Sequence, residues 1–120
     1  MTELALQLDA DSVEPGDPIT GTVRWQGRIS GLEVLLRWET AGKGTKDTEI
    51  VERTAVVVAE HEVREARFEL VAPERPFSFS GTLISLTYYV RVEHADARAG
   101  HIESEIVIAP GGTEVRLARA

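Results

Sequence analysis

The chain has 120 residues, no cysteine and a formal net charge of -7, with 13 Lys and Arg against 20 Asp and Glu. This length suits one domain, and 42% hydrophobic residues is typical of a folded chain rather than a disordered one. The acidic charge opposes binding to nucleic acid and to anionic lipid, while the lack of cysteine excludes disulfides and sulfur-ligated zinc. No basic leader and no apolar run of membrane-spanning length occurs, so we expect a cytoplasmic protein without membrane insertion.

Apolar residues recur at every second position, the spacing that places them on one face of an extended strand. The first such run covers 3–9, and a turn is expected at 13–16, where Pro15 presets φ and Gly16 accepts a positive φ. We expect this turn to set the register between the first strand and the second. The inward residues would then be Leu4, Leu6 and Leu8 on the first strand, facing Ile19, Val23 and Trp25 on the second.

The next three predicted strands cover 32–39, 48–58 and 66–71. A glycine-rich polar loop at 41–47 separates the first two of these. The stretch 55–59 is continuously apolar, so its face is ambiguous, and a bulge or a change of sheet there would resolve the pattern.

Pro73 ends the fifth strand, and a long connection over 72–82 follows, with two phenylalanines to fasten it. The longest candidate strand, 82–93, should lie centrally in its sheet and form a hairpin with 102–108. Residues 113–120 are predicted as a weak terminal strand or a frayed tail. The pattern indicates one all-β domain over 1–120, an immunoglobulin-like antiparallel β-sandwich of about seven to eight strands.

Two segments resemble the amino-terminal domain of the arrestin family. In the first, Pro15-Gly16-Asp17 leads into Ile19-Thr20-Gly21-Thr22-Val23, similar to the family's Pro-Gly-acidic turn and following apolar-x-Gly-x-apolar strand. In the second, Pro73 and Ser80-Gly81 precede a strand that contains Tyr88. The order and separation of the two segments also agree with the family. The resemblance implies an arrestin-like sandwich, related in fold to retromer-type proteins and bacterial sporulation-control proteins.

The chain departs from that family in ways that bear on function. Arrestins have two such domains, and basic residues on the first strand sense phosphate. This chain matches one domain and carries Glu3, Gln7 and Asp9 on the corresponding strand. Binding to phosphorylated receptors is therefore not carried over.

Two motifs resemble ligand sites. Gly42-Lys43-Gly44-Thr45 lacks the longer glycine frame and the following helix of a phosphate-binding loop, so a hairpin loop is the simpler interpretation. His94, Asp96 and His101 would converge on a metal only if the 95–100 turn brought both strand ends together, and histidines beside an exposed hairpin are more often solvated. We assign no metal and no cofactor.

Catalytic residues are also not assigned. The serines at 78, 80 and 85 lack a neighbouring base and a nucleophile-elbow pattern. Glu103 and Glu105 share one strand face, but their alternation with Ile102 and Ile106 favours a solvated face over a carboxylate pair for hydrolysis. The sequence therefore favours a non-enzymatic protein.

Two functions remain open. The first is an intracellular protein-interaction or scaffolding module, which docks a protein partner on loops or on a strand edge, a homodimer included. Its predicted contact residues are Lys43, Lys46, Arg75, Phe77 and Phe79. The alternative is a sandwich that binds a small ligand or carbohydrate, with Trp25 or Trp38 as a stacking platform. Both tryptophans are in phase with core residues, which favours their burial.

Overall fold

The computed structural model describes residues 3–26, 31–42, 46–56, 65–76, 78–80, 84–94, 100–112 and 115–116. Within these ranges the chain forms strands and one short 3-10 helix. The elements are β1 (Glu3–Leu8), β2 (Ser12–Val13), β3 (Pro18–Gln26), β4 (Leu32–Gly42), β5 (Thr48–Val56), β6 (Glu65–Val71), β7 (Phe79–Ser80), β8 (Ile84–His94), β9 (His101–Ile108), η2 (Pro110–Gly112) and β10 (Val115–Arg116). None of the described elements is a helix of the length and apolarity that crossing a membrane requires.

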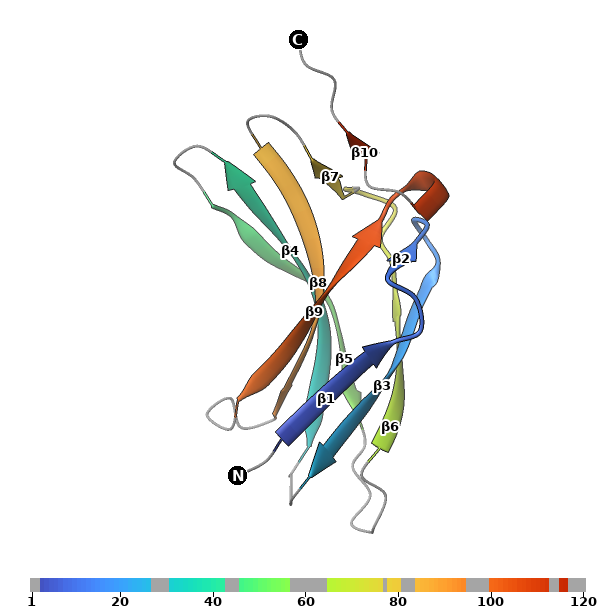
Figure 1. Ribbon diagram of the computed structural model, residues 1–120, viewed down its shortest axis with the longest axis vertical. Helices are drawn as coiled ribbons and strands as arrows, with labels where there is room; N and C mark the ends of the chain where they lie inside the picture. The colour runs from blue at the N-terminus through green and yellow to red at the C-terminus, as the bar shows by residue number, and fades with distance from the viewer. Residues whose placement is uncertain are drawn as a thin grey trace.

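The strands form two sheets that face each other (Figure 1). In the smaller sheet β3 lies between β1 and β6, and all its pairs are antiparallel. In the larger sheet β8 is central, since it pairs with β4 on one side and with β7 and β9 on the other. β5 follows β4, while β2 and β10 add short parallel pairs to β9 and β7. The predicted all-β sandwich and the central place of the longest strand are both confirmed.

The core lies between the sheets and follows the predicted alternation. Leu4 pairs with Trp25, Leu6 with Val23, and Leu8 with Gly21, so the inward residues of the first two long strands do face each other. The buried hydrophobic residues of the core cluster are Ile19, Val23, Trp25, Leu32, Val34, Leu36, Val56, Phe68, Leu70, Ala72, Leu86, Tyr88, Val90, Val92, Ile106 and Ile108.

Gly21 is the one position of β3 where a side chain would collide with the core. A Cβ there would lie 2.7 Å from the Phe68 ring and 2.7 Å from the backbone oxygen of Gln7. Phe68 occupies the space that any other residue at position 21 would need.

The Pro15-Gly16 turn differs from its prediction in two respects. It covers 14–17, one residue later than expected, because the Asp17 N–H donates to the Glu14 carbonyl at 3.1 Å, and Gly16 has φ of 85° as a type II turn requires. It also does not join two paired strands. The turn lies between β2 and β3, and β2 pairs with β9 of the larger sheet rather than with β3. The turn is fastened to the end of β6 instead, since the Gly16 N–H donates to the Ala72 carbonyl at 2.9 Å.

The connection between β6 and β8 is held by two buried polar side chains. The Tyr88 hydroxyl donates to the Pro76 carbonyl at 2.8 Å. The Ser78 hydroxyl accepts the Ile108 N–H at 3.0 Å, and the Ser78 N–H donates to the Ile108 carbonyl at 2.7 Å. Phe79 packs against the core as predicted, while Phe77 lies outside the described residues.

A bulge interrupts the pairing of β4 with β5, at a different place from the predicted one. Leu36 pairs with Glu52 and Arg37 pairs with Ile50, so Val51 is the extra residue. The prediction placed the irregularity at 55–59, but Ala55 is exposed and Val56 is buried, a regular alternation. Residues 57–59 lie outside the described part of the chain.

Candidate protein-binding edge

The sandwich has two long sides, and among the described strands backbone pairing links the two sheets at one end of one side. On the side of β1 and β9, the chain crosses from one sheet to the other through β2, so Val13 pairs with Ile108. The Val107 N–H donates to the Asp11 carbonyl at 2.9 Å, and the Ala109 N–H donates to the Val13 carbonyl at 3.2 Å. We call this side, formed by β1, β2 and β9, the closed side.

The opposite side, formed by β5 and β6, is the open side. The two strands are neighbours but belong to different sheets: β5 pairs only with β4, and β6 only with β3, among the described strands. One hydrogen bond links them there, from the Val71 N–H to Oε2 of Glu52 at 3.1 Å. Each strand thus keeps one side of its backbone free of strand pairing, which is a potential site for another strand.

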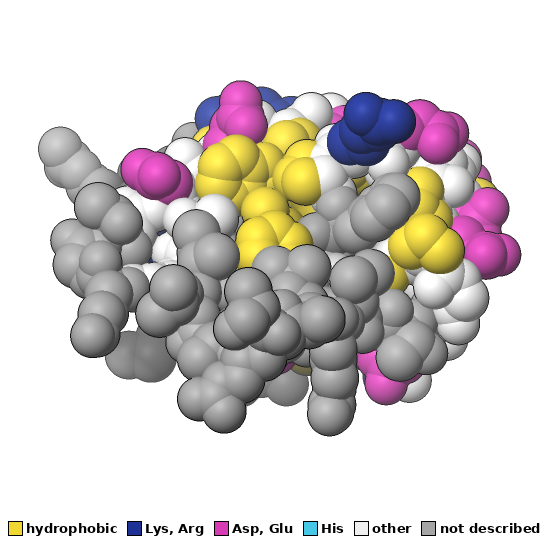
Figure 2. All heavy atoms as spheres, turned by 90° about the horizontal axis from the view of Figure 1, so that it is seen from above, with side chains coloured by type: hydrophobic (Ala, Val, Ile, Leu, Met, Phe, Trp, Pro, Cys, Tyr) yellow, Lys and Arg dark blue, Asp and Glu magenta, His cyan; other side chains and the backbone are white. Residues whose placement is uncertain are grey.

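Exposed large hydrophobic side chains border this same side. Among the residues whose burial is described, they are Ile50, Val51 and Val71, with 43%, 36% and 51% of their surfaces exposed. The first two are on β5 and the third ends β6. Seen from the end that carries the β4–β5 hairpin, β7 and β10, hydrophobic side chains come to the surface among acidic and basic side chains (Figure 2).

The bulge at Val51 decides which β5 side chains point inward. After the bulge, Glu52 pairs with the core residue Leu36, and before it Glu49 pairs with Trp38, which also packs against the core. Since directly paired residues share a face, both carboxylates point to the inner side of the sheet, and Ile50 points to the outer side beside Arg37. Continued from Glu52, unbroken alternation would have put Ile50 inside and Glu49 outside, so the bulge exposes an apolar residue and turns Glu49 inward beside Glu52.

Glu49 affects the core electrostatically. Burial is the larger cause that raises the pKa of Tyr88, to about 12, and the nearby Glu49 carboxylate adds to the increase. The hydroxyl therefore stays protonated and donates to Pro76 throughout the physiological range.

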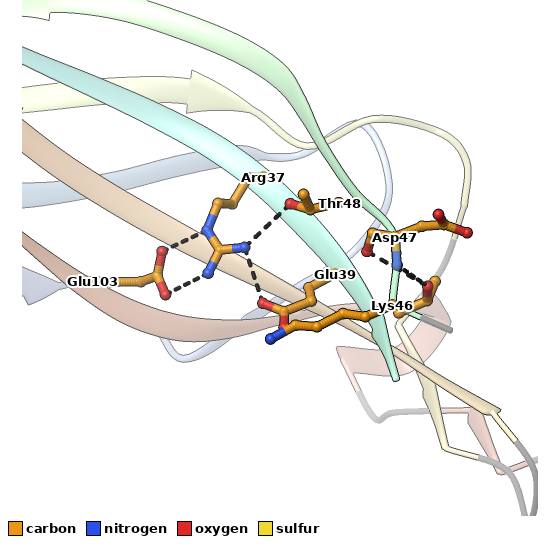
Figure 3. A network of polar contacts seen from close by, with 7 residues as sticks. Arg37, Glu39, Lys46, Asp47, Thr48 and Glu103 are labelled. Atoms are coloured by element: carbon orange, nitrogen blue, oxygen red, sulfur yellow. Dashed lines mark hydrogen bonds and ion pairs between the residues drawn. The ribbon is translucent and has the colours of Figure 1, made fainter. Parts of the chain in front are cut away.

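The outer face of the larger sheet carries a polar network centred on Arg37 (Figure 3). Arg37 donates to both oxygens of Glu103 at 2.6 Å, and its Nη1 donates to Glu39 at 3.0 Å and to Thr48 at 3.3 Å. The guanidinium also lies 4.6 Å from the centre of the Tyr89 ring. Lys46 forms an ion pair with the other oxygen of Glu39.

In this network each cation, Arg37 or Lys46, is paired with at least one carboxylate of Glu39 and Glu103. The hydrogen bonds from Arg37 lower the pKa of Glu103, and Glu103 in turn raises the pKa of Arg37. Glu103 is thus not the freely solvated residue that the sequence predicts, because it neutralises Arg37 of β4 from across β8. A bidentate pair of this kind fixes side-chain positions and leaves neither group free to act as an acid or base.

The smaller sheet has a simpler arrangement on its outer face. Arg67 reaches across β3 and binds both carboxylate oxygens of Asp9, and the Thr20 hydroxyl donates to Asp9 at 2.6 Å. The hydrogen bonds from Arg67 and then Thr20 lower the pKa of Asp9 to about 2. This ion pair ties the end of β1 to β6.

The predicted contact residues have different surroundings. Lys43 and Phe77 lie outside the described residues. Lys46 is bound to Glu39, Arg75 is exposed, and Phe79 packs against the core. The open side was not predicted, although the adjacent apolar residues Ile50 and Val51 between two glutamates were a local sign of it.

The two predicted metal ligands that are described point apart. His94 is buried, whereas His101 is exposed and pairs with Glu93 on the outer face. In the described ranges, no three His, Cys, Asp or Glu residues form a group suited to a metal ion. Trp25 is 6% exposed and Trp38 packs against the core, so neither ring is an open stacking platform.

A shallow hollow of about 400 Å³ lies at the end of the closed side, and it is lined by Ser12, Val13, Glu14, Asp17, Pro18 and Gly111. Glu14 accepts the Gly111 N–H at 3.2 Å, which occupies one of the two carboxylates there. The hollow has no buried polar group that would orient a ligand.

No protein-family model and no curated protein matches the chain. Among solved structures, it is similar to the sporulation control protein Spo0M from Bacillus subtilis, with 14% identity, 90% of this chain covered and a TM-score of 0.66. The chain spans about half (49%) of the length of Spo0M. β-Glucosidases from Listeria innocua align with TM-scores of 0.47 and 0.44, 16% and 17% identity and 95% of this chain, but 16% of their own length. The first similarity supports an arrestin-like fold, and the others are too weak to inform the argument.

Proposed function

We propose that the domain is a non-enzymatic protein-binding module of arrestin-like type and that its partner docks on the open side. The observation that carries the proposal is the coincidence of two features along β5: a nine-residue strand with one free backbone side, and exposed hydrophobic residues at Ile50 and Val51. A free strand edge offers hydrogen bonds, and neighbouring apolar side chains offer contact area.

Two further observations support a binding role. The described ion pairs of both outer faces are closed on themselves, so those charges serve the fold rather than a reaction. Spo0M, similar in fold, is named as a control protein, which agrees with a regulatory rather than a catalytic role. Membership of the arrestin family and a cytoplasmic location belong to the same proposal.

The test compares the same charge change on the two sides of the sandwich. Val51→Lys alters the open side, and Ala5→Lys alters an exposed position of β1 on the closed side. Each variant, carrying an affinity tag, is used to recover partners from an extract of the organism that encodes the protein. We expect Val51→Lys to reduce recovery of the partner by about tenfold or more, and Ala5→Lys to leave it unchanged.

Both substitutions should leave the free energy of unfolding within about 0.5 kcal/mol, because both sites are on the surface. Denaturant melts check this before recovery is compared. Equal recovery by both variants, or loss with Ala5→Lys alone, would refute docking on the open side.

A further inference from the structure

The open side is acidic as well as apolar. The basic residues of β5 and β6 as described, Arg53 and Arg67, are engaged within their own sheets, with Glu33 on β4 and with Asp9 at the end of β1. The acidic residues of this side include Glu49 and Glu69, and neither has an ion-pair partner among the described residues. The side thus presents unbalanced negative charge beside Ile50, Val51 and Val71.

We propose that the occupant of this side is an extended segment of the partner in which Lys or Arg alternates with apolar residues, added as a strand along β5. This inference rests on the proposed function, and it specifies the chemistry of the partner. An extended segment matches the free backbone edge, its apolar residues match Ile50 and Val51, and its cations match Glu49 and Glu52.

The backbone geometry favours a different chain over a second copy as the occupant. In an antiparallel β5–β5 pair, each copy would bring its own Glu49 and Glu52 to the shared edge, and like charges across paired strands are destabilising. Each copy carries a net charge of -7, which adds long-range repulsion.

The inward carboxylates add selectivity for cations. Glu52 accepts the Val71 N–H, and Glu49 comes close enough to Tyr88 to raise the pKa of its hydroxyl. Glu52 is partly buried and Glu49 is exposed, and both lie on the inner face of β5, so their carboxylates are in reach of a cationic side chain on a strand added beside them.

The probes are two synthetic peptides of about ten residues, the length of an ordinary strand. In one, Lys alternates with Val, and in the other Glu replaces each Lys. Binding is measured by fluorescence anisotropy, and the contact site by amide chemical shifts of the isotope-labelled domain. We expect the basic peptide to bind about tenfold or more tightly than the acidic one, and to shift the amides of β5 and Val71.

The carboxylates are tested by Glu49→Gln combined with Glu52→Gln. The matched control is Asp11→Asn combined with Glu105→Gln, which changes the net charge equally at exposed positions on the closed side, beside and on β9. The first pair of substitutions should weaken binding of the basic peptide by about tenfold, and the control pair should have little effect on that binding. Raising the salt concentration from about 50 mM to about 300 mM should weaken binding too.

Several results would overturn the inference. Equal affinity for both peptides, or equal weakening by both double variants, would show that local charge does not select the occupant. A basic peptide with proline at alternate positions should lose binding, and retention would exclude strand addition. A dimer in sedimentation that Val51→Lys dissociates would identify a second copy as the occupant. Val51→Lys can abolish recovery of the natural partner while the domain binds the basic and acidic peptides equally, and then only the charge assignment fails. If Val51→Lys leaves recovery of the partner unchanged, the proposed function itself fails.

Discussion

The two long sides of the sandwich differ in how the backbone groups at their strand edges are paired. On the closed side the chain itself crosses between the sheets, and β2 uses backbone groups of β9 that would otherwise face solvent. On the open side β5 and β6 remain separate among the described strands, and one side-chain hydrogen bond from Val71 to Glu52 joins them. Since β1 also pairs only with β3 among the described strands, the difference lies in the side chains beside the unpaired edge: on the open side they include the exposed Ile50, Val51 and Val71. The bulge and the inward carboxylates of β5 protect that edge from indiscriminate pairing.

The largest effect should come from the turn that follows β2. Gly16→Val places a β-branched residue at φ of 85°, with a Cβ 2.8 Å from the Glu74 carboxylate. We expect a loss of about 1–3 kcal/mol in the free energy of unfolding. Denaturant melts measure it.

The matched control is Gly111→Val, because Gly111 also has a positive φ, of 73°, but nothing lies within 4 Å of its Cβ position. A greater loss at Gly16 than at Gly111 would come from the backbone hydrogen bonds that fasten this turn to Ala72, because the exposed Glu74 side chain can move away from the added atoms. Wild-type stability in Gly16→Val would contradict a structural role of the turn on the closed side.

A smaller effect is expected for the link across the open side. Glu52→Ala removes the acceptor of the Val71 N–H, a group close to solvent, so the cost should be at most about 1 kcal/mol. Glu52→Gln keeps an oxygen acceptor and should retain most of the stability. Hydrogen exchange at the Val71 amide distinguishes the two, with faster exchange only in Glu52→Ala. Equal exchange in both variants would show that the link does not hold β6.

The contrast between the sides also explains what could be predicted from the sequence. Alternation predicted the long strands and their buried faces because each strand is half-buried over several residues, as with Leu86, Tyr88, Val90 and Val92. It did not predict β2 or β7, because two residues carry no period, while β10 lies within the weak terminal strand that was one of the two expectations for 113–120. The change of sheet at β2 depends on contacts with β9, which lies far away in the sequence.

The open side could not be predicted from the sequence for a related reason. The bulge at Val51 reverses the phase of β5, and either phase fits the residues at 48–52. The exposure of Val71 depends on which strand lies beside β6, and no local residue encodes that. Lys46 was predicted as a partner contact from its loop position, but the hairpin pairing of Glu39 with Thr48 brings Glu39 close to it.

The smallest expected effect concerns the ion pair at the start of the closed side. Asp9 has a pKa of about 2 in the folded protein, against an ordinary value of 3.8, because Arg67 and Thr20 donate hydrogen bonds to its carboxylate. A lowered folded-state pKa means that the ion pair stabilises the fold above about pH 4 and loses this effect as the pH falls toward about 2. Asp9→Asn removes the titrating group but keeps the size of the side chain. We therefore expect wild type to exceed Asp9→Asn in stability by a constant amount from about pH 5 to pH 7, and the difference to shrink between about pH 4 and pH 2.

Both proteins retain Glu103, so its titration cancels in the comparison. Because the pair is exposed, added salt should reduce the difference at neutral pH. Unfolding midpoints of the two proteins across this pH range provide the measurement. A difference that stays constant down to about pH 2 would show that the Asp9–Arg67 contact does not persist in solution, and that β1 and β6 are held in the smaller sheet by their pairing with β3.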